Sequence, residues 1–154
     1  MLTDAERAEI EEELKHYPTK QAACVEALKV IQRRHGWVSD EHLQGVAALL
    51  GMTVDDLDGV ATFYSLIFRK PVGRHVALLC NSVSCWMLGS DGLCRYMEQR
   101  LGIPLGGTTQ DGRLTLLPVV CLGACDHAPV MMVDTDLHRD LDQEKVDRIL
   151  ERYA

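Results

Sequence analysis

The sequence lacks any apolar run long enough to cross a membrane. A transmembrane helix needs about 20 consecutive apolar residues, and no stretch of the 154 residues approaches that length. The N-terminal segment MLTDAERAEIEEELKHY is rich in acidic residues and has no apolar core of the secretory kind. We therefore expect a cytoplasmic protein that does not itself insert into the membrane.

A basic excess and nucleotide-binding motifs are also missing. The chain has 16 Lys and Arg against 23 Asp and Glu, a net charge of −7. Because phosphate binding needs clustered Lys and Arg, nucleic acid is not an expected partner. There is no GxGxxG segment, no P-loop and no nucleophile–base set. If the protein acts in redox chemistry, it is a relay, and the substrate is converted elsewhere.

Two different sequence patterns divide the chain, and they change at LIFRKPVG (66–73). The first pattern is helical, with apolar residues on narrow faces and a plausible N-cap before each helix. The expected starts are Thr3 or Asp4, Pro18 with Thr19, Ser39 and Thr53. We predict an N-terminal helical domain over residues 1–72.

Residues 73–154 alternate strands and helices. The expected order is strand 75–80, a loop over 81–90, helix 91–102, strand 113–121, strand 129–134, a hairpin partner near Leu137 and a final helix over 142–153. A strand–helix–strand crossover normally makes its two strands parallel. The overall prediction is an α/β fold, with a small sandwich of strands and helices following the helical domain.

Two cysteine pairs have the spacing of metal ligands, Cys80-x4-Cys85 and Cys121-x3-Cys125. Each pair begins at the predicted C-terminal end of a strand. If these strands are parallel neighbours, both loops leave the same end of the sheet and four thiolates can converge. In a reducing compartment, such a cluster is more often a metal or redox site than a set of disulfides.

Four kinds of site are compatible with paired cysteines. A [2Fe–2S] cluster fits best, because it is wider than one ion and accepts looser spacing within each pair. Structural zinc is the main alternative, although its knuckles are most often Cys-x2-Cys. A thioredoxin-type redox pair needs Cys-x2-Cys at a helix start, and disulfides need an oxidising compartment.

The residues beside the two pairs suit a metal centre. Ser82 and Ser84 can donate hydrogen bonds to sulfur, and such donors tune a cluster's potential. Gly123 and Ala124 allow the backbone to approach closely without a side-chain clash.

Other candidate ligands are interpreted as structural. Cys24 and Cys94 each lie on an apolar helix face and are expected to be small core residues. His127 is expected to be a loop residue rather than a ligand. Trp86 and Met87 are expected to shield the site or to pack on the following helix.

Several segments occur in the order typical of one family. They are EALKVIQRRHGWV (26–38), GVATFYSLIFRKPVGRH (59–75), the cysteine pair at 80–85, GGTTQDGRLTLLPVVCLGAC (106–125) and MMVD (131–134). In these segments the chain resembles the thioredoxin-like [2Fe–2S] subunit of bacterial respiratory complex I (NADH:quinone oxidoreductase, NuoE type). The resemblance covers nearly the whole chain.

The resemblance implies that residues 73–154 form a thioredoxin-like [2Fe–2S] ferredoxin domain. It implies one cluster, held by Cys80, Cys85, Cys121 and Cys125, that exchanges an electron with FMN. FMN and the NADH site are expected on a partner flavoprotein subunit only. The chain would then be peripheral to the inner membrane through complex I, and the short N-terminus would fit a bacterial subunit. By analogy with thioredoxins, Pro129 is expected to follow a cis peptide bond.

Two alternatives to the complex I subunit remain at this point. One is the equivalent diaphorase subunit of an NAD-linked hydrogenase or formate dehydrogenase, which pairs with a flavoprotein in the same way. The other is a thioredoxin-like binding module whose fold is stabilised by a structural zinc ion. Such a module has no redox role.

Overall fold

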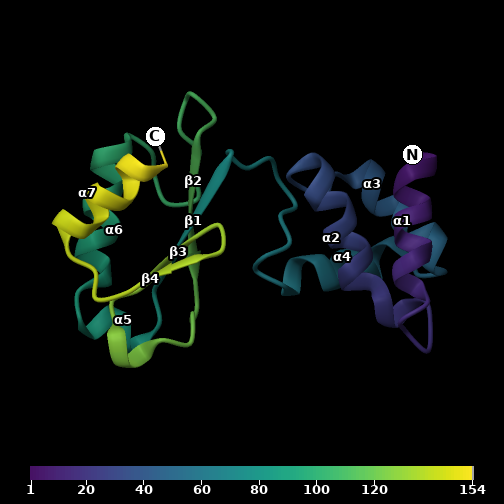
Figure 1. Cartoon of the computed structure of the whole chain (residues 1–154), viewed down its shortest axis with the longest axis horizontal. Helices are drawn as coiled ribbons and strands as arrows, with labels where there is room; N and C mark the ends of the chain where they lie inside the picture. The colour runs from purple at the N-terminus through teal and green to yellow at the C-terminus, as the bar shows by residue number, and fades with distance from the viewer. Residues whose placement is uncertain (154) are drawn as a thin grey trace. The chain divides into compact units, whose positions relative to one another are not determined.

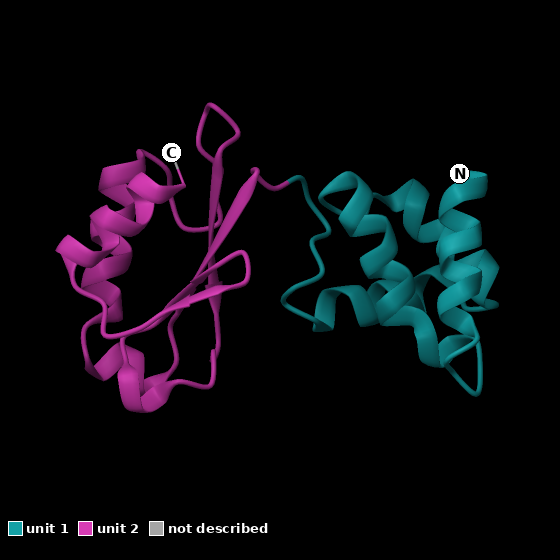
Figure 2. Ribbon diagram, in the orientation of Figure 1, with its two compact units in different colours: residues 1–71 teal, residues 72–154 magenta. Residues whose placement is uncertain are grey.

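The structure, a computed structural model, describes residues 1–153. It divides the chain into two compact units, Met1–Pro71 and Val72–Ala154 (Figure 2). Each unit has a hydrophobic core of its own. None of the described helices combines the length and the apolar character needed to cross a bilayer.

The first unit is entirely helical (Figure 1). Its elements are α1 (Asp4–Leu14), a 3-10 turn (Gln21–Ala23), α2 (Cys24–His35), α3 (Asp40–Leu50) and α4 (Val54–Phe63). Three of the four α-helices begin at predicted caps, whereas α2 begins at Cys24 and not after Pro18 and Thr19 as expected. The side chains of Thr3, Ser39 and Thr53 each accept a hydrogen bond from a backbone N–H in the first turn. These bonds satisfy N–H groups that have no partner within the helix.

The core of the first unit lies among these four helices. Its fully buried large side chains come from every α-helix and include Ile10, Leu28, Ile31, Leu50 and Leu57. Cys24 packs against this core, as predicted. Isolated helices of 10–12 residues are marginal in water, so mutual burial of these faces is what holds the unit together.

The second unit is a four-stranded sheet with helices. Its elements are β1 (His75–Cys80), α5 (Val83–Met87), α6 (Ser90–Leu101), β2 (Leu114–Val119), a 3-10 turn (Cys125–His127), β3 (Met131–Val133), β4 (Asp136–His138) and α7 (Gln143–Arg152). The strand order is β2-β1-β3-β4. β1 and β2 are parallel neighbours, as predicted, and the other two pairings are antiparallel. Pro118 lies in the edge strand β2, where a missing N–H is tolerated.

Alternate residues of the strands pack beneath two helices. The core combines Ala77, Leu79, Leu114, Leu116, Met131 and Val133 of the sheet with Leu93 and Met97 of α6 and Val146, Ile149 and Leu150 of α7. Figure 1 shows α6 and α7 side by side against the sheet. Cys94 packs against this core, again as predicted. This core is therefore built from residues of the second unit.

The structure differs from the predicted elements at three places. The expected loop over residues 81–90 contains the short helix α5. Strand β2 ends at Val119, so Cys121 lies two residues beyond the strand instead of at its last position. Strand β3 is limited to Met131–Val133. The expected cis bond at Ala128–Pro129 is present.

Candidate metal centre

The sheet brings the two cysteine pairs to one edge. Cys80 is the last residue of β1, and Cys85 lies in α5, which follows it directly. Cys121 follows β2, and Cys125 begins the 3-10 turn after it. Because β1 and β2 are parallel neighbours, both chain segments leave the sheet at the same end. The predicted convergence of the two loops is therefore found.

The sulfur atoms are arranged as two close pairs. Sγ of Cys121 lies 3.8 Å from Sγ of Cys125. The Cys80 thiol donates to the backbone carbonyl of Val120 over 3.6 Å and lies close enough to Cys85 to raise its pKa. The two pairs also interact across the site, since Cys125 and Cys80 each act electrostatically on a thiol of the opposite pair.

The two pairs differ in exposure. Cys80 and Cys85 are 2% and 1% exposed, whereas Cys121 and Cys125 are exposed to solvent. The site is thus closed on the side of β1 and α5 and open on the side of the loop after β2. A bound group would be anchored in the protein interior and accessible from one direction.

Burial and neighbouring thiols oppose ionisation of these cysteines. Loss of hydration raises the pKa of Cys85 to about 11, with a further contribution from the Cys80 thiol. The Cys121 thiol raises the pKa of Cys125. Since metals bind thiolates, loading this site must release protons.

One backbone donor is hydrogen-bonded to a sulfur, and two further neighbours lower the pKa of a cysteine. The backbone N–H of Gly123 donates to Sγ of Cys121 over 3.3 Å. A backbone hydrogen bond from Val130 lowers the pKa of Cys85, and one from the Ser84 side chain lowers that of Cys125. Ser84 was a predicted donor, whereas Ser82 occupies the N-cap position of α5 and its side chain makes no capping bond. Val130 was not anticipated, because a backbone donor leaves no signal in the residue type.

The spacing of the sulfurs suits a two-metal group better than one ion. Four thiolates around a tetrahedral zinc, each about 2.3 Å from the metal, would all lie about 3.8 Å apart. Among residues 1–153, one group of three Cys, His, Asp or Glu ligand atoms lies within 4.8 Å of one another, and it contains no cysteine. No three of the four sulfurs are therefore this close together. Two pairs, each able to bind its own metal, fit the thiol ligation of a binuclear iron–sulfur cluster.

The remaining candidates lie outside the thiol set. Cys24 and Cys94 belong to the cores of the two units. His127 is in the 3-10 turn, where its Nδ1 contacts Asp140 at 3.1 Å. Trp86 and Met87 are 58% and 73% exposed, so they are not buried against the following helix, and their shielding of the site stays a prediction. The short α5 turns these two side chains outward while it turns Cys85 inward.

Known proteins match the whole chain. A family model described as thioredoxin-like [2Fe-2S] ferredoxin matches residues 10–154. The E subunit of the NADH-quinone oxidoreductase of Pseudomonas aeruginosa is 47% identical over 154 residues, which is 100% of this chain and 93% of that protein. Its counterpart in Escherichia coli (strain K12) is 50% identical over 152 residues, 99% of this chain and 92% of that protein.

A solved structure has the same fold. An NAD+-reducing [NiFe]-hydrogenase in its air-oxidised state superposes with a TM-score of 0.71. The match covers 85% of this chain and 22% of that one, at 21% sequence identity. At this identity the likeness concerns the fold alone.

Proposed function

Since the chain belongs to the family of thioredoxin-like [2Fe–2S] ferredoxins, we propose that it is the electron-transfer subunit of an NADH-quinone oxidoreductase, respiratory complex I. The observation that carries this proposal is its identity of 47% and 50% with two NADH-quinone oxidoreductase E subunits over essentially the full length of every chain compared. The protein is a subunit of an oxidoreductase, and its own cofactor is one [2Fe–2S] cluster.

The ligands of the cluster are Cys80, Cys85, Cys121 and Cys125. Their support is the convergence of both cysteine-bearing segments at one edge of the sheet and the 3.8 Å separation of Cys121 and Cys125. When bound, the cluster supplies reversible one-electron chemistry. Cys80 and Cys85 anchor the site in the interior, and the N–H of Gly123 supports the Cys121 thiolate.

The residues around the site determine how readily it accepts an electron and from which side the electron arrives. Hydrogen-bond donors to the sulfurs stabilise added negative charge and so set the tendency of the site to accept an electron. The exposure of Cys121 and Cys125 leaves one side through which an electron can pass over a short distance. The chain has no nucleotide motif, so the electron comes from another subunit.

That partner is a flavoprotein subunit that carries FMN and the NADH site, within the rest of complex I. A group of exposed apolar side chains next to the cysteines supports such docking: Val83, Trp86, Met87, Leu88 and Val120. Clusters of exposed apolar residues on soluble proteins commonly mark interaction sites, and aromatic residues dominate their binding energy. The subunit would be cytoplasmic and peripheral to the inner membrane through this complex.

Co-expression with the flavoprotein subunit of the same organism tests the proposal. We expect a stable complex of the two chains on size-exclusion chromatography, with both flavin and iron present. Trp86→Glu should weaken the complex at least roughly tenfold, because it places a charge in the apolar contact. Leu105→Glu, at an exposed apolar residue outside this group, is the matched control. Failure of the unaltered chains to associate would overturn the proposed partner.

The diaphorase subunit of an NAD-linked hydrogenase or formate dehydrogenase is the less favoured function. The hydrogenase shares the fold at 21% identity, whereas the two NADH-quinone oxidoreductase subunits share 47% and 50%.

A further inference from the structure

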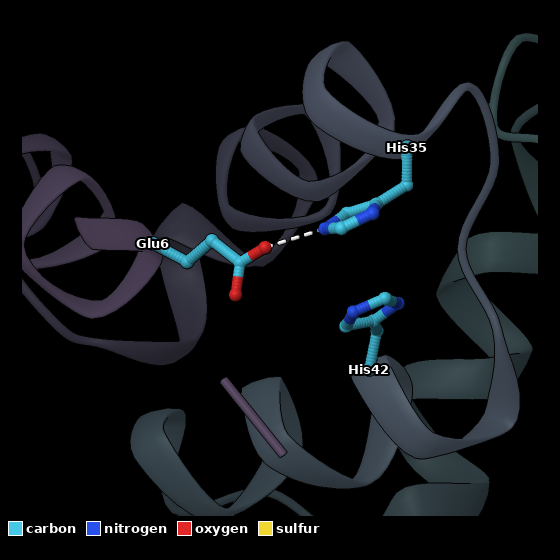
Figure 3. Close-up of side chains that lie close together, drawn as sticks. All are labelled: Glu6, His35 and His42. Carbon is cyan, nitrogen blue, oxygen red and sulfur yellow. Dashed lines mark hydrogen bonds and ion pairs between the residues drawn. The ribbon is translucent and has the colours of Figure 1, made fainter. Parts of the chain in front are cut away.

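Three side chains from three helices of the first unit come together at a place far from any cysteine ligand in the sequence. They are Glu6 of α1, His35 at the end of α2 and His42 in the first turn of α3. One ligand atom of each lies within 4.8 Å of the other two, and this is the only such group among residues 1–153. Figure 3 shows both imidazole rings on the same side of the Glu6 carboxylate. All three residues belong to Met1–Pro71.

The carboxylate is held in place from two directions. Glu6 is only 2% exposed. Its Oε2 accepts a hydrogen bond from the backbone N–H of Thr3 at 2.7 Å, and its Oε1 contacts Nε2 of His35 at 2.5 Å. Hydrogen bonds of this kind favour the charged form of a carboxylate. The helix cap therefore fixes a negatively charged oxygen pair inside the helical unit.

The second imidazole is positioned beside the first. The rings of His35 and His42 stack with centroids 4.2 Å apart and planes inclined by 29°. Nδ1 of His42 contacts Oγ of Ser39 at 3.0 Å. Ser39 is itself fixed as the N-cap of α3, accepting the His42 backbone N–H at 3.2 Å. Metal-ligating histidines commonly use one ring nitrogen in this way, which orients the ring and leaves the other nitrogen for a ligand bond.

An ion pair between Glu6 and His35 explains why these two side chains lie together, but it does not explain the position of His42. His42 makes no hydrogen bond with Glu6 or His35, yet its ring stacks on the ring of His35. Two imidazoles and one carboxylate are a donor set that zinc uses in proteins, with water in the fourth position. Imidazole nitrogen is also a good ligand for Cu²⁺ and Ni²⁺. Mg²⁺ and Ca²⁺ prefer oxygen ligands and do not fit this donor set.

We propose that Glu6, His35 and His42 form a binding site for a divalent first-row transition metal, with Zn²⁺ as the ion best suited to it. Tetrahedral bonds of about 2.0 Å require ligand atoms roughly 3.3 Å apart. The contact between Glu6 and His35 would have to open from 2.5 Å by less than about 1 Å. The His35 side chain is 39% exposed, so it can make this movement and the ion can enter from solvent.

The bound ion would tie α1 to the ends of α2 and α3 that meet at this corner. A ligand that binds only the folded state stabilises it by RT ln(1 + [L]/Kd), where [L] is the free ligand concentration. The site thus links metal occupancy to the stability of the helical unit. It uses no residue of the proposed iron–sulfur site, so either proposal can fail without the other.

Calorimetric titration of the full-length, iron-loaded chain with ZnCl₂ tests this site. Loading with iron keeps the thiols occupied, and the iron content is measured before and after to exclude exchange. We expect one equivalent of Zn²⁺ to bind, and His42→Asn to weaken binding at least about tenfold, or about 1.4 kcal/mol. His16→Asn, at an exposed histidine outside the group, is the control and should bind as the unaltered chain does.

Imidazole NMR resonances of the unaltered chain give a second readout that needs no substitution. Added Zn²⁺ should shift the ring signals of His35 and His42 and leave that of His16 in place. The proposal is overturned if the titration shows no binding, if His42→Asn binds Zn²⁺ as tightly as the control, or if the two ring signals do not move.

Discussion

The backbone N–H of Gly123 donates a hydrogen bond to Sγ of Cys121 over 3.3 Å, and Gly123 adopts a positive φ of 75° to do so. This conformation is costly for residues with a Cβ. Gly123 therefore has two roles: it allows the loop to adopt a positive φ, and its N–H stabilises negative charge on the Cys121 sulfur.

Replacement of Gly123 tests this double role. A Cβ at this position would meet no atom within 4 Å, so Gly123→Ala acts through backbone strain alone, at a cost of about 1–2 kcal/mol. We expect the strained loop to weaken the N–H···S bond and to lower the reduction potential, measured by potentiometric titration. Gly92→Ala, at an uncrowded helical glycine without a positive φ, is the control. Equal potentials in the two variants would contradict the proposed role of Gly123.

The ligand assignment predicts a sharp division among the six cysteines. Cys121→Ser and Cys125→Ser should each reduce the iron content and the visible absorbance of the purified full chain by roughly tenfold or more. Cys24→Ser and Cys94→Ser should retain both, because these residues pack against the two cores. Loss of the visible spectrum in the Cys24 variant, with retention in the Cys121 variant, would mean that the ligand set is wrong.

The partly buried side chain of His138 should make the stability of the second unit depend on pH. Burial lowers the pKa of His138 below its usual value, with a smaller effect from Arg152. Its Nε2 is buried and has no hydrogen-bond partner in the described part of the chain. As the pH falls below about 6.5, the unfolded chain binds a proton at this residue before the folded one does, so the folded state loses stability.

His138→Leu removes both the unpaired nitrogen and this proton uptake. We expect the variant to be more stable than the unaltered chain by about 1 kcal/mol at neutral pH. The difference should widen towards about pH 5.5, as measured by urea unfolding of the full chain. His16→Leu, at an exposed histidine, is the control. A difference that stays constant over this pH range would refute the linkage.

The predicted domain boundary leads to a truncation experiment. The sheet unit has its own core, built only from residues of the sheet and of α6 and α7 and their neighbours. We propose that residues 73–154 fold alone and bind the cluster, with the same visible spectrum as the full chain. The same fragment with Cys121→Ser should be colourless. If the fragment acquires its spectrum only when residues 1–72 are supplied, the two parts are not independent domains.

Local signals were sufficient to predict much of the fold. Side chains such as Thr3, Ser39 and Thr53 cap a helix through bonds to the next turn, so their effect is visible within four residues. The strand expected over residues 75–80 is β1, and the crossover rule made β1 and β2 parallel.

Features set by tertiary contacts were missed. The five residues of α5 are too few to show a helical period, and an apolar Trp86 beside a cysteine suggested burial where the chain leaves it exposed. Glu6 and His35 are 29 residues apart, and only the packing of α1 on α2 brings them together. A backbone donor such as Val130 has no counterpart in the residue types at all.

The most direct test is electron paramagnetic resonance of the purified full chain after dithionite reduction, combined with analysis of metal and acid-labile sulfide. A binuclear cluster on Cys80, Cys85, Cys121 and Cys125 predicts about two irons, about two sulfides and about one unpaired electron per chain. An anaerobically purified chain that is colourless, contains zinc at these thiols and has no signal after reduction would contradict the account.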